Sequence, residues 1–190
     1  VISRLDEDYF AAAGATRHLM VWQRNGELAY QLPVDGRIIY ALTATPDGRI
    51  LVCGDDRAHI DMWLMGFDAN QRGLPLLQRA RLHGHESPIS HLSMNSSGRL
   101  LLSAALDSKV RLWNLEDGSC VSELDHNGES ISSCDFWGSG LSSVSLEGGL
   151  RIWDRRGIQI DLVEGHAPLT CLASKRNRIY FGSRNGEVFC

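Results

Sequence analysis

The sequence lacks the features typical of a membrane protein, a secreted protein or a general nucleic-acid binder. Its apolar runs are far shorter than the roughly 20 residues that a transmembrane helix needs. The first ten residues already carry Arg4 and three carboxylates, so we expect no signal peptide. Lys and Arg number 19 against 23 Asp and Glu, a net charge of −4, which is opposite in sign to a nucleic-acid footprint. We therefore expect neither nucleic-acid binding nor membrane insertion.

Cysteine is also sparse, and its spacing excludes a disulfide framework or a zinc cluster. The chain has five cysteines, with no C-x-x-C pair. Each stands among small or apolar residues: Cys53, Cys120, Cys134, Cys171 and Cys190. We expect reduced, packed cysteines and hence an intracellular protein, cytoplasmic or nuclear.

Recognisable catalytic motifs are missing as well. The sequence has no G-x-S-x-G, no Walker loop and no H-E-x-x-H. The seven histidines are scattered, and the nearest pair, His83 and His85, has only one further ligand type beside it. We expect no catalytic residues, no metal and no cofactor. The enzymatic alternative is a hydrolase built on His83, His85 and Asp107.

What the sequence does contain is an internal repeat marked by tryptophan. Four of the five tryptophans end short apolar runs: Trp22, Trp63, Trp113 and Trp153. Their spacings are 41, 50 and 40 residues. Turn residues separate runs of alternating apolarity, and Gly is enriched at 19 residues, a pattern of short strands. A helical alternative exists only over 9–22, where alanines would suit it.

This period of about 40 residues, with a Trp near its end, resembles the WD-repeat family. The best unit, 83–124, has a Gly-His, a strand serine, a turn aspartate and the Trp. The resemblance implies an all-β β-propeller of four-stranded antiparallel blades. It also implies one hydrogen-bonded structural tetrad, formed by His85, Ser103, Asp107 and Trp113. The expected blades are approximately 1–32, 33–82, 83–124, 125–163 and 164–190.

The other units depart from this pattern, so we expect incomplete or absent tetrads there. The fourth unit has His126, Ser143, Glu147 and Trp153, with Glu in place of Asp. The second has Cys53 where the serine would fall. Blades with fewer bonds between buried groups should open more easily.

The sequence holds just under five blades. In the last unit it stops one residue before the expected Trp, and it begins inside a first strand. Because the family is most often seven-bladed, we expect a segment of a larger propeller and a longer, multidomain chain. The alternative is a small propeller, or one completed by a partner.

Partner binding on a propeller is expected on its loops. Four cations recur near turns on one expected face: Arg17, Arg57, Lys109 and Arg184. They predict a site for an acidic or phosphorylated peptide. The alternative is scattered, solvated charges balanced by neighbouring carboxylates.

A second candidate is the extra length of the second unit at 65–77. It predicts a long loop on the opposite face, with Phe67 and Leu74 as docking side chains. The alternative is a surface hairpin that packs on its own blade.

A third candidate is the segment 153–156, Trp-Asp-Arg-Arg. It resembles the WDxR box of receptors that dock on cullin-4 ubiquitin ligases, with Arg156 at the basic position. Val144 and Ser142 depart from that box. Our leading hypothesis is a non-enzymatic interaction scaffold, part of a multi-protein complex, that binds protein or peptide partners. The alternative is a substrate receptor of a cullin-4 type ligase.

Overall fold

The computed structural model of the chain describes residues 1–190 except 5–8, 17, 35–36, 68–72, 139, 166 and 176–177. For 66–67 and 73–79 only the backbone is described. Every regular element in the described part is a β-strand, which confirms the all-β prediction. The helical alternative for 9–22 is excluded, because Tyr9–Ala12 and His18–Gln23 are strands.

The strands form five antiparallel sheets, which we call blades 1 to 5 in chain order. Blade 1 holds β1 (Ile2–Arg4), β2 (Tyr9–Ala12), β3 (His18–Gln23) and β4 (Leu28–Pro33). Blade 2 holds β5 (Ile39–Ala44), β6 (Ile50–Asp55), β7 (Ile60–Phe67) and β8 (Gly73–Leu82). Blade 3 holds β9 (Ile89–Met94), β10 (Leu100–Ala105), β11 (Lys109–Asn114) and β12 (Cys120–Asp125). Blade 4 holds β13 (Ile131–Trp137), β14 (Gly140–Ser145), β15 (Leu150–Trp153) and β16 (Gln159–Val163). Blade 5 holds β17 (Leu169–Lys175), β18 (Arg178–Ser183) and β19 (Val188–Phe189).

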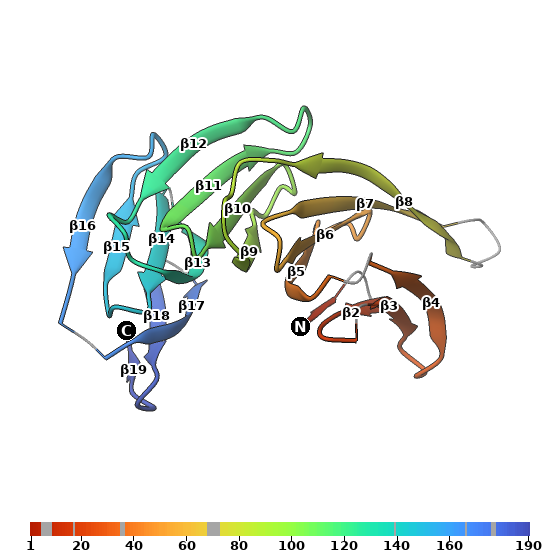
Figure 1. Ribbon diagram of the computed structural model, residues 1–190, viewed down its shortest axis with the longest axis horizontal. Helices are drawn as coiled ribbons and strands as arrows, with labels where there is room; N and C mark the ends of the chain where they lie inside the picture. The colour runs from red at the N-terminus through yellow and green to blue at the C-terminus, as the bar shows by residue number, and fades with distance from the viewer. Residues whose placement is uncertain are drawn as a thin grey trace.

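The blades are arranged in an arc, with the first strand of each blade innermost (Figure 1). Within a blade the strands follow chain order, each beside the next. The inner strands β1, β5, β9, β13 and β17 contact one another in that order. This is the expected arrangement of a partial propeller.

The core lies between the blades. Trp113 of blade 3 is 2% exposed and packs in one cluster with Ile60 and Met62 of blade 2. Trp153 of blade 4 packs in the next cluster with Leu112 of blade 3. Full burial of one large apolar side chain contributes roughly 1.5–3 kcal/mol. Each of these indoles therefore joins its blade to the preceding one.

Polar side chains also tie the inner strands of neighbouring blades. The carboxylate of Asp135 on β13 accepts hydrogen bonds from the Ser93 hydroxyl on β9 (2.7 Å) and the Ser174 amide on β17 (2.7 Å). Ser90 donates to the Ile131 carbonyl at 2.6 Å. Three consecutive blades are thus linked through their innermost strands.

In blades 1 to 4 the outer strand carries a β-bulge beside the repeat tryptophan. The register shifts fall at Val21/Trp22, Met62/Trp63, Leu112/Trp113 and Ile152/Trp153. A bulge bends an edge strand and limits its pairing with another chain.

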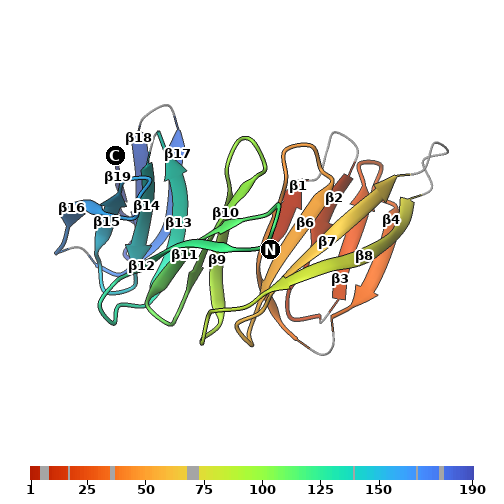
Figure 2. The ribbon, with the colours of Figure 1, turned by 90° about the horizontal axis from the view of Figure 1, so that it is seen from above.

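Because consecutive strands are antiparallel, the loops gather on two opposite faces (Figure 2). The connection face carries the turns between second and third strands and the links between blades. It includes 56–59, 83–88, 106–108, 126–130, 146–149 and 184–187. The turn face carries the remaining hairpin turns, among them 95–99, 115–119 and 154–158.

The extra length of blade 2 extends two strands, which corrects the prediction of a long loop over 65–77. β7 runs to Phe67 and β8 starts at Gly73, so most of that segment is a paired hairpin. The side chains of Phe67 and Leu74 lie outside the described residues.

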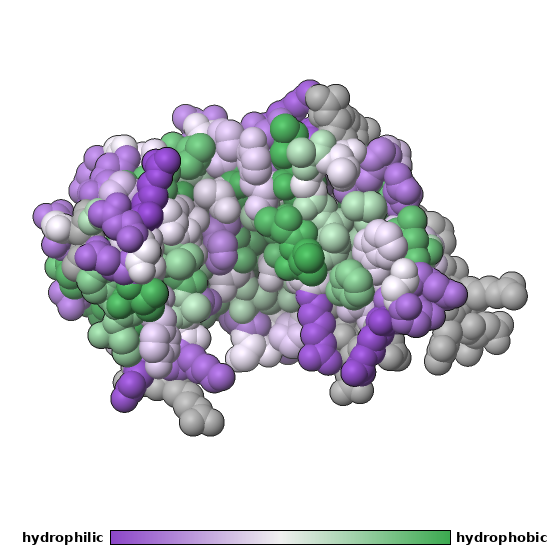
Figure 3. All heavy atoms as spheres, turned by 90° about the horizontal axis from the view of Figure 1, so that it is seen from below, coloured by the Kyte–Doolittle hydropathy of each residue, from purple (hydrophilic) through white to green (hydrophobic). Residues whose placement is uncertain are grey.

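Apolar surface is exposed at the two ends of the arc. Ile2 is 72% exposed and Val188 is 78% exposed. Viewed from below, apolar side chains gather in separate areas of this side of the molecule (Figure 3). In the part of the chain that the structure describes, no helix is long and apolar enough to cross a membrane.

Candidate functional site

Blade 3 holds a closed hydrogen-bonded set beneath the connection face. His85 Nδ1 lies 2.8 Å from Asp107 Oδ2, and its Nε2 lies 2.7 Å from Ser103 Oγ. Trp113 Nε1 donates to the same Oγ at 2.8 Å. The guanidinium of Arg111 lies 2.9 Å from the same Nδ1, so this nitrogen faces both a carboxylate acceptor and an arginine donor. The structure therefore brings all four residues of the expected tetrad together.

Asp107 anchors the loop above this set. Burial works to raise the pKa of its carboxyl, but hydrogen bonds from His85 and the Glu86 amide outweigh burial and hold it at about 2. Arg111, two residues before Trp113, lies 3.3 Å from Asp107 and also pairs with Glu123. The turn is thus fixed by charge as well as by hydrogen bonds.

Blade 4 contains a related hydrogen-bonded set around His126. His126 Nε2 lies 2.7 Å from Ser143 Oγ, which accepts from Trp153 Nε1 at 2.9 Å. Glu147 does not face the histidine, contrary to the expected substitution of Glu for Asp. Its Oε2 instead accepts from the Ser130 amide at 2.9 Å.

The partner of His126 Nδ1 is the guanidinium of Arg151, at 2.8 Å. Glu129 in turn binds Arg151 through both carboxylate oxygens, at 2.6 and 3.0 Å. Because a guanidinium only donates, Nδ1 is unprotonated, and Nε2–H donates to Ser143. Burial and the neighbouring Arg151 charge lower the pKa of His126 to about 3.

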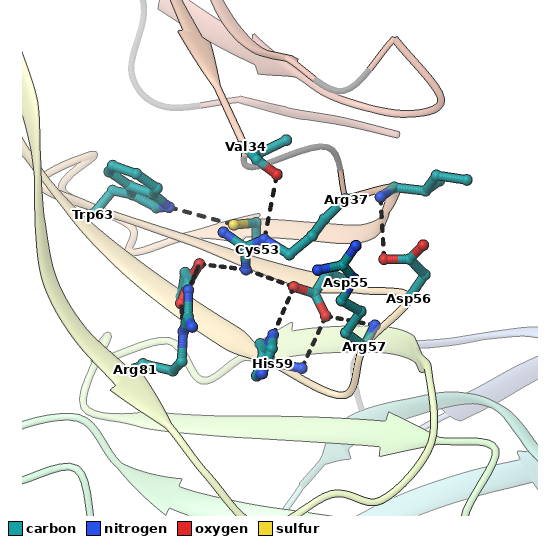
Figure 4. Close-up of polar contacts among 11 residues, drawn as sticks. Val34, Arg37, Cys53, Asp55, Asp56, Arg57, His59, Trp63 and Arg81 are labelled. Atoms are coloured by element: carbon teal, nitrogen blue, oxygen red, sulfur yellow. Dashed lines mark hydrogen bonds and ion pairs between the residues drawn. The ribbon is translucent and has the colours of Figure 1, made fainter.

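In blade 2 the same region holds a buried ion cluster that sequence reasoning missed (Figure 4). Arg37 lies between Asp55 (2.6 Å) and Asp61 (2.8 Å), and all three side chains are at most 5% exposed. Arg81 closes the cluster at 2.6 Å from Asp61. Burial acts against ionisation of Asp61, yet hydrogen bonds from Arg81 and Arg37 lower its pKa. The sequence pattern that could have revealed this cluster is the position of Asp61. It stands two residues before Trp63, as Arg111 stands two residues before Trp113.

In blade 2 the counterpart of the tryptophan–serine hydrogen bond joins Trp63 Nε1 to the Cys53 thiol, at 3.4 Å. In blade 5 two aromatic rings take the equivalent space, because Phe181 and Phe189 stack with centroids 5.0 Å apart. Blades 2 to 5 therefore place different side chains in contact at equivalent positions.

Two apolar residues stand exposed at equivalent turns of the connection face. Leu106 is 42% exposed and Leu146 is 40% exposed. The Leu106 amide donates to the Pro88 carbonyl at 3.1 Å, and the Leu146 amide donates to the Ser130 carbonyl at 2.9 Å. Each side chain is thus presented on a turn tied to the link that enters its blade.

The four cations predicted to bind an acidic peptide differ in their surroundings. Lys109 forms an ion pair with Glu123 on the adjacent strand. Arg57 and Arg184 are exposed on the connection face. Arg17 lies outside the described residues.

Arg156, the basic residue of the box-like segment, is exposed in the β15–β16 turn on the turn face. Its amide donates to Asp154 Oδ1 at 2.8 Å, while Trp153 is buried. Arg155 beside it lines a cavity of about 740 Å³ between blades 3 and 4, with Leu100 and Phe136 among the walls.

Cysteine placement corrects part of the sequence analysis. Cys53 and Cys134 are buried, but Cys120, Cys171 and Cys190 are exposed, so the expectation of five packed thiols is wrong for these three. Among the described residues no three His, Cys, Asp or Glu side chains are grouped as metal ligands would be.

Comparison with known proteins gives consistent matches. The family described as WD domain, G-beta repeat matches residues 77–114, the segment that contains the complete tetrad. The chain is similar to Periodic tryptophan protein 2 homolog of Schizosaccharomyces pombe, 35% identical over 133 residues, covering 68% of this chain and 15% of that protein. It is also similar to COMPASS component SWD3 of Saccharomyces cerevisiae, 28% identical over 116 residues, covering 58% of this chain and 33% of that protein. The chain spans a third or less of these relatives.

Solved structures resemble the chain in fold. A computationally designed protein, Ika8, superposes with a TM-score of 0.80 at 21% identity, covering 97% of this chain and 55% of that one. A chain of the Mitotic Checkpoint Complex gives 0.78 at 17% identity, covering 96% and 56%. The arc of blades therefore spans about half of each of these chains.

Proposed function

Because this chain belongs to the WD-repeat family, we propose that it is a non-enzymatic scaffold that binds protein or peptide partners through its connection face. The observation that carries the proposal is the exposure of Leu106 and Leu146 at equivalent turns. Both turns rest on buried hydrogen-bonded sets, so little ordering of the loop is needed on binding.

The buried histidines support a scaffold over a hydrolase. Both ring nitrogens of His85 face protein partners, and its side chain is fully buried. The same holds for His126. A general base must reach a substrate proton, and these rings are already occupied by structural partners.

The relatives favour an assembly role. One is named as a component of COMPASS, and one structural neighbour is a chain of the Mitotic Checkpoint Complex. Five free cysteines suit a reducing compartment. The proposal therefore includes an intracellular location, in the cytoplasm or the nucleus, and membership of a multi-protein complex.

The test compares the proteins that co-purify with the full-length protein and with its Leu106→Ser/Leu146→Ser variant. The matched control is Ile158→Ser/Ile160→Ser, since those residues, 58% and 59% exposed, lie in or beside the outer strand β16. We expect a set of partners lost only with the leucine variant. Equal recovery with all three proteins would contradict the proposal.

The alternative of a cullin-4 ligase receptor rests on the exposed Arg156. Its side chain is accessible on the turn face while Trp153 beside it is structural. If the segment is a docking box, wild type will capture the purified cullin-4 adaptor and Arg156→Ala will not. Equal capture, or none by either protein, would leave Arg156 with no docking role.

A further inference from the structure

We infer that the connection face of blades 3 and 4 selects peptides in which apolar side chains are flanked by Lys or Arg. This inference rests on the proposed function and names the chemistry of the partner. It departs from the prediction of an acidic or phosphorylated ligand, and the structure supplies the reason.

The turns that carry the two leucines are linked to each other through the inner strands of their blades. Leu106 is bonded to the Pro88 carbonyl, and Leu146 is bonded to the Ser130 carbonyl. Two residues after Pro88, the Ser90 hydroxyl donates to the Ile131 carbonyl at 2.6 Å, next to Ser130. A short chain of bonds therefore connects the two turns across the blade boundary.

An exposed carboxylate lies near each leucine in the sequence or in its turn. Glu86 is exposed, and its amide binds Asp107, the neighbour of Leu106. Glu147 is exposed and follows Leu146 directly. Among the described residues neither carboxylate takes part in an ion pair, so each still carries an uncompensated negative charge.

The cations of blades 3 and 4 that lie toward this face form ion pairs within their own blades. Lys109 and Arg111 pair with Glu123, and Arg151 pairs with Glu129. The exposed cations Arg57 and Arg184 belong to blades 2 and 5, on either side. On the connection face of blades 3 and 4, Glu86 and Glu147 are therefore exposed charges beside the leucines with which no cation of these blades is shown to pair.

Complementary charge at the rim of an apolar contact favours encounter and rejects partners of the same sign. A cationic side chain near Glu86 or Glu147 would be attracted, whereas a phosphate there would meet two carboxylates. The apolar side chains of the peptide would contact the exposed side chains of Leu106 and Leu146.

The test selects a random displayed peptide library on the immobilised full-length protein, with counter-selection on Leu106→Ser/Leu146→Ser. We expect enriched peptides to combine an aliphatic or aromatic residue with adjacent Lys or Arg. Enriched peptides are then synthesised in three forms: as selected, with glutamate replacing each cation, and with phosphoserine replacing each cation.

Fluorescence anisotropy then measures Kd for wild type, for Glu86→Gln/Glu147→Gln, and for Glu116→Gln on the turn face as control. The cationic form should bind best, and the double variant should weaken it about ten-fold, the size expected of two exposed charge interactions. The control should bind as wild type does.

Each other outcome overturns the inference in a distinguishable way. Acidic or phosphorylated forms that bind better than cationic forms, and still require the leucines, would contradict the charge class but leave the proposed binding face intact. Cationic peptides unaffected by the double variant would contradict the role of Glu86 and Glu147. An absence of leucine-dependent enrichment would contradict both this inference and the proposed function.

Discussion

The Nδ1 atom of His126 accepts a hydrogen bond from the guanidinium of Arg151 at 2.8 Å. One blade earlier, Nδ1 of His85 faces the carboxylate of Asp107 at the same distance. The guanidinium of Arg111 also lies 2.9 Å from that Nδ1, so the arginine contact is common to both blades, whereas the close carboxylate contact belongs to blade 3. Related blades thus keep the same serine, tryptophan and arginine contacts while the carboxylate beside the histidine changes.

The low pKa of His126 makes the stability of the protein depend on pH. Its pKa is about 3 in the folded protein and about 6.5 when unfolded. Below pH 6.5 the unfolded state binds the additional proton, so the free energy of unfolding falls as pH decreases toward 3. At pH 5 the loss from this residue is about 2 kcal/mol relative to pH 7.5.

Urea unfolding of wild type and His126→Gln at pH 7.5 and pH 5 measures this loss. The variant should show the smaller change with pH. It keeps some dependence, because burial also lowers the pKa of His91. Identical pH dependence of the two proteins would show that His126 is not the residue responsible.

Loss of the blade 3 tryptophan should destabilise the protein far more than loss of the blade 1 tryptophan. Trp113→Ala removes a buried ring and leaves the Ser103 hydroxyl without its donor, at a cost of roughly 3–5 kcal/mol. Trp22 is only half-buried, and Ala12 stands at the serine position of its blade. Chemical denaturation of both variants is the measurement, and equal losses would contradict a stabilising role of the tetrad.

Removal of Asp61 should lower the free energy of unfolding more than removal of a surface carboxylate does. Asp61→Ala removes one of the carboxylates that face the buried guanidinium of Arg37, and it also removes the carboxylate that pairs with Arg81. Breaking a buried pair by removing one partner costs about 3–5 kcal/mol. The matched control is Glu116→Gln, which breaks a 3.4 Å pair whose side chains are both about two-thirds exposed or more.

Denaturant unfolding should place the control close to wild type and Asp61→Ala well below it. Similar stability of the two variants would mean that the cluster contributes little to the fold.

Thiol labelling should separate the cysteines into two classes. Burial raises the pKa of Cys53 to about 12 and also raises that of Cys134. A thiolate-directed reagent at pH 8 should modify Cys120, Cys171 and Cys190 in the native protein and all five residues in urea. Mass spectrometry of the labelled peptides reads the result, and native labelling of Cys134 would show that blades 3 and 4 separate in solution.

The strands, their grouping into blades and the tetrad of blade 3 were predictable from the amino-acid sequence alone. Each repeat supplies its own strands, joined by short turns, so pairing is local and follows from turn residues and period-two apolarity. The tetrad is predictable for the same reason, because Ser103 and Trp113 lie on adjacent strands of one hairpin, whose register sets their approach.

The partners of the long charged side chains could not be predicted, because they depend on how the sheets stack. Glu129, not Glu147, binds the arginine beside His126, and Arg37 reaches both Asp55 and Asp61 from the link between blades. Asp135 collects bonds from strands of two other blades. Long flexible side chains choose partners only after the sheets have stacked, since burial penalises whichever charge is left unpaired. The same stacking paired Lys109 with Glu123, and among the described residues it left Glu86 and Glu147 without an ion pair beside the two exposed leucines, which no spacing along the chain shows.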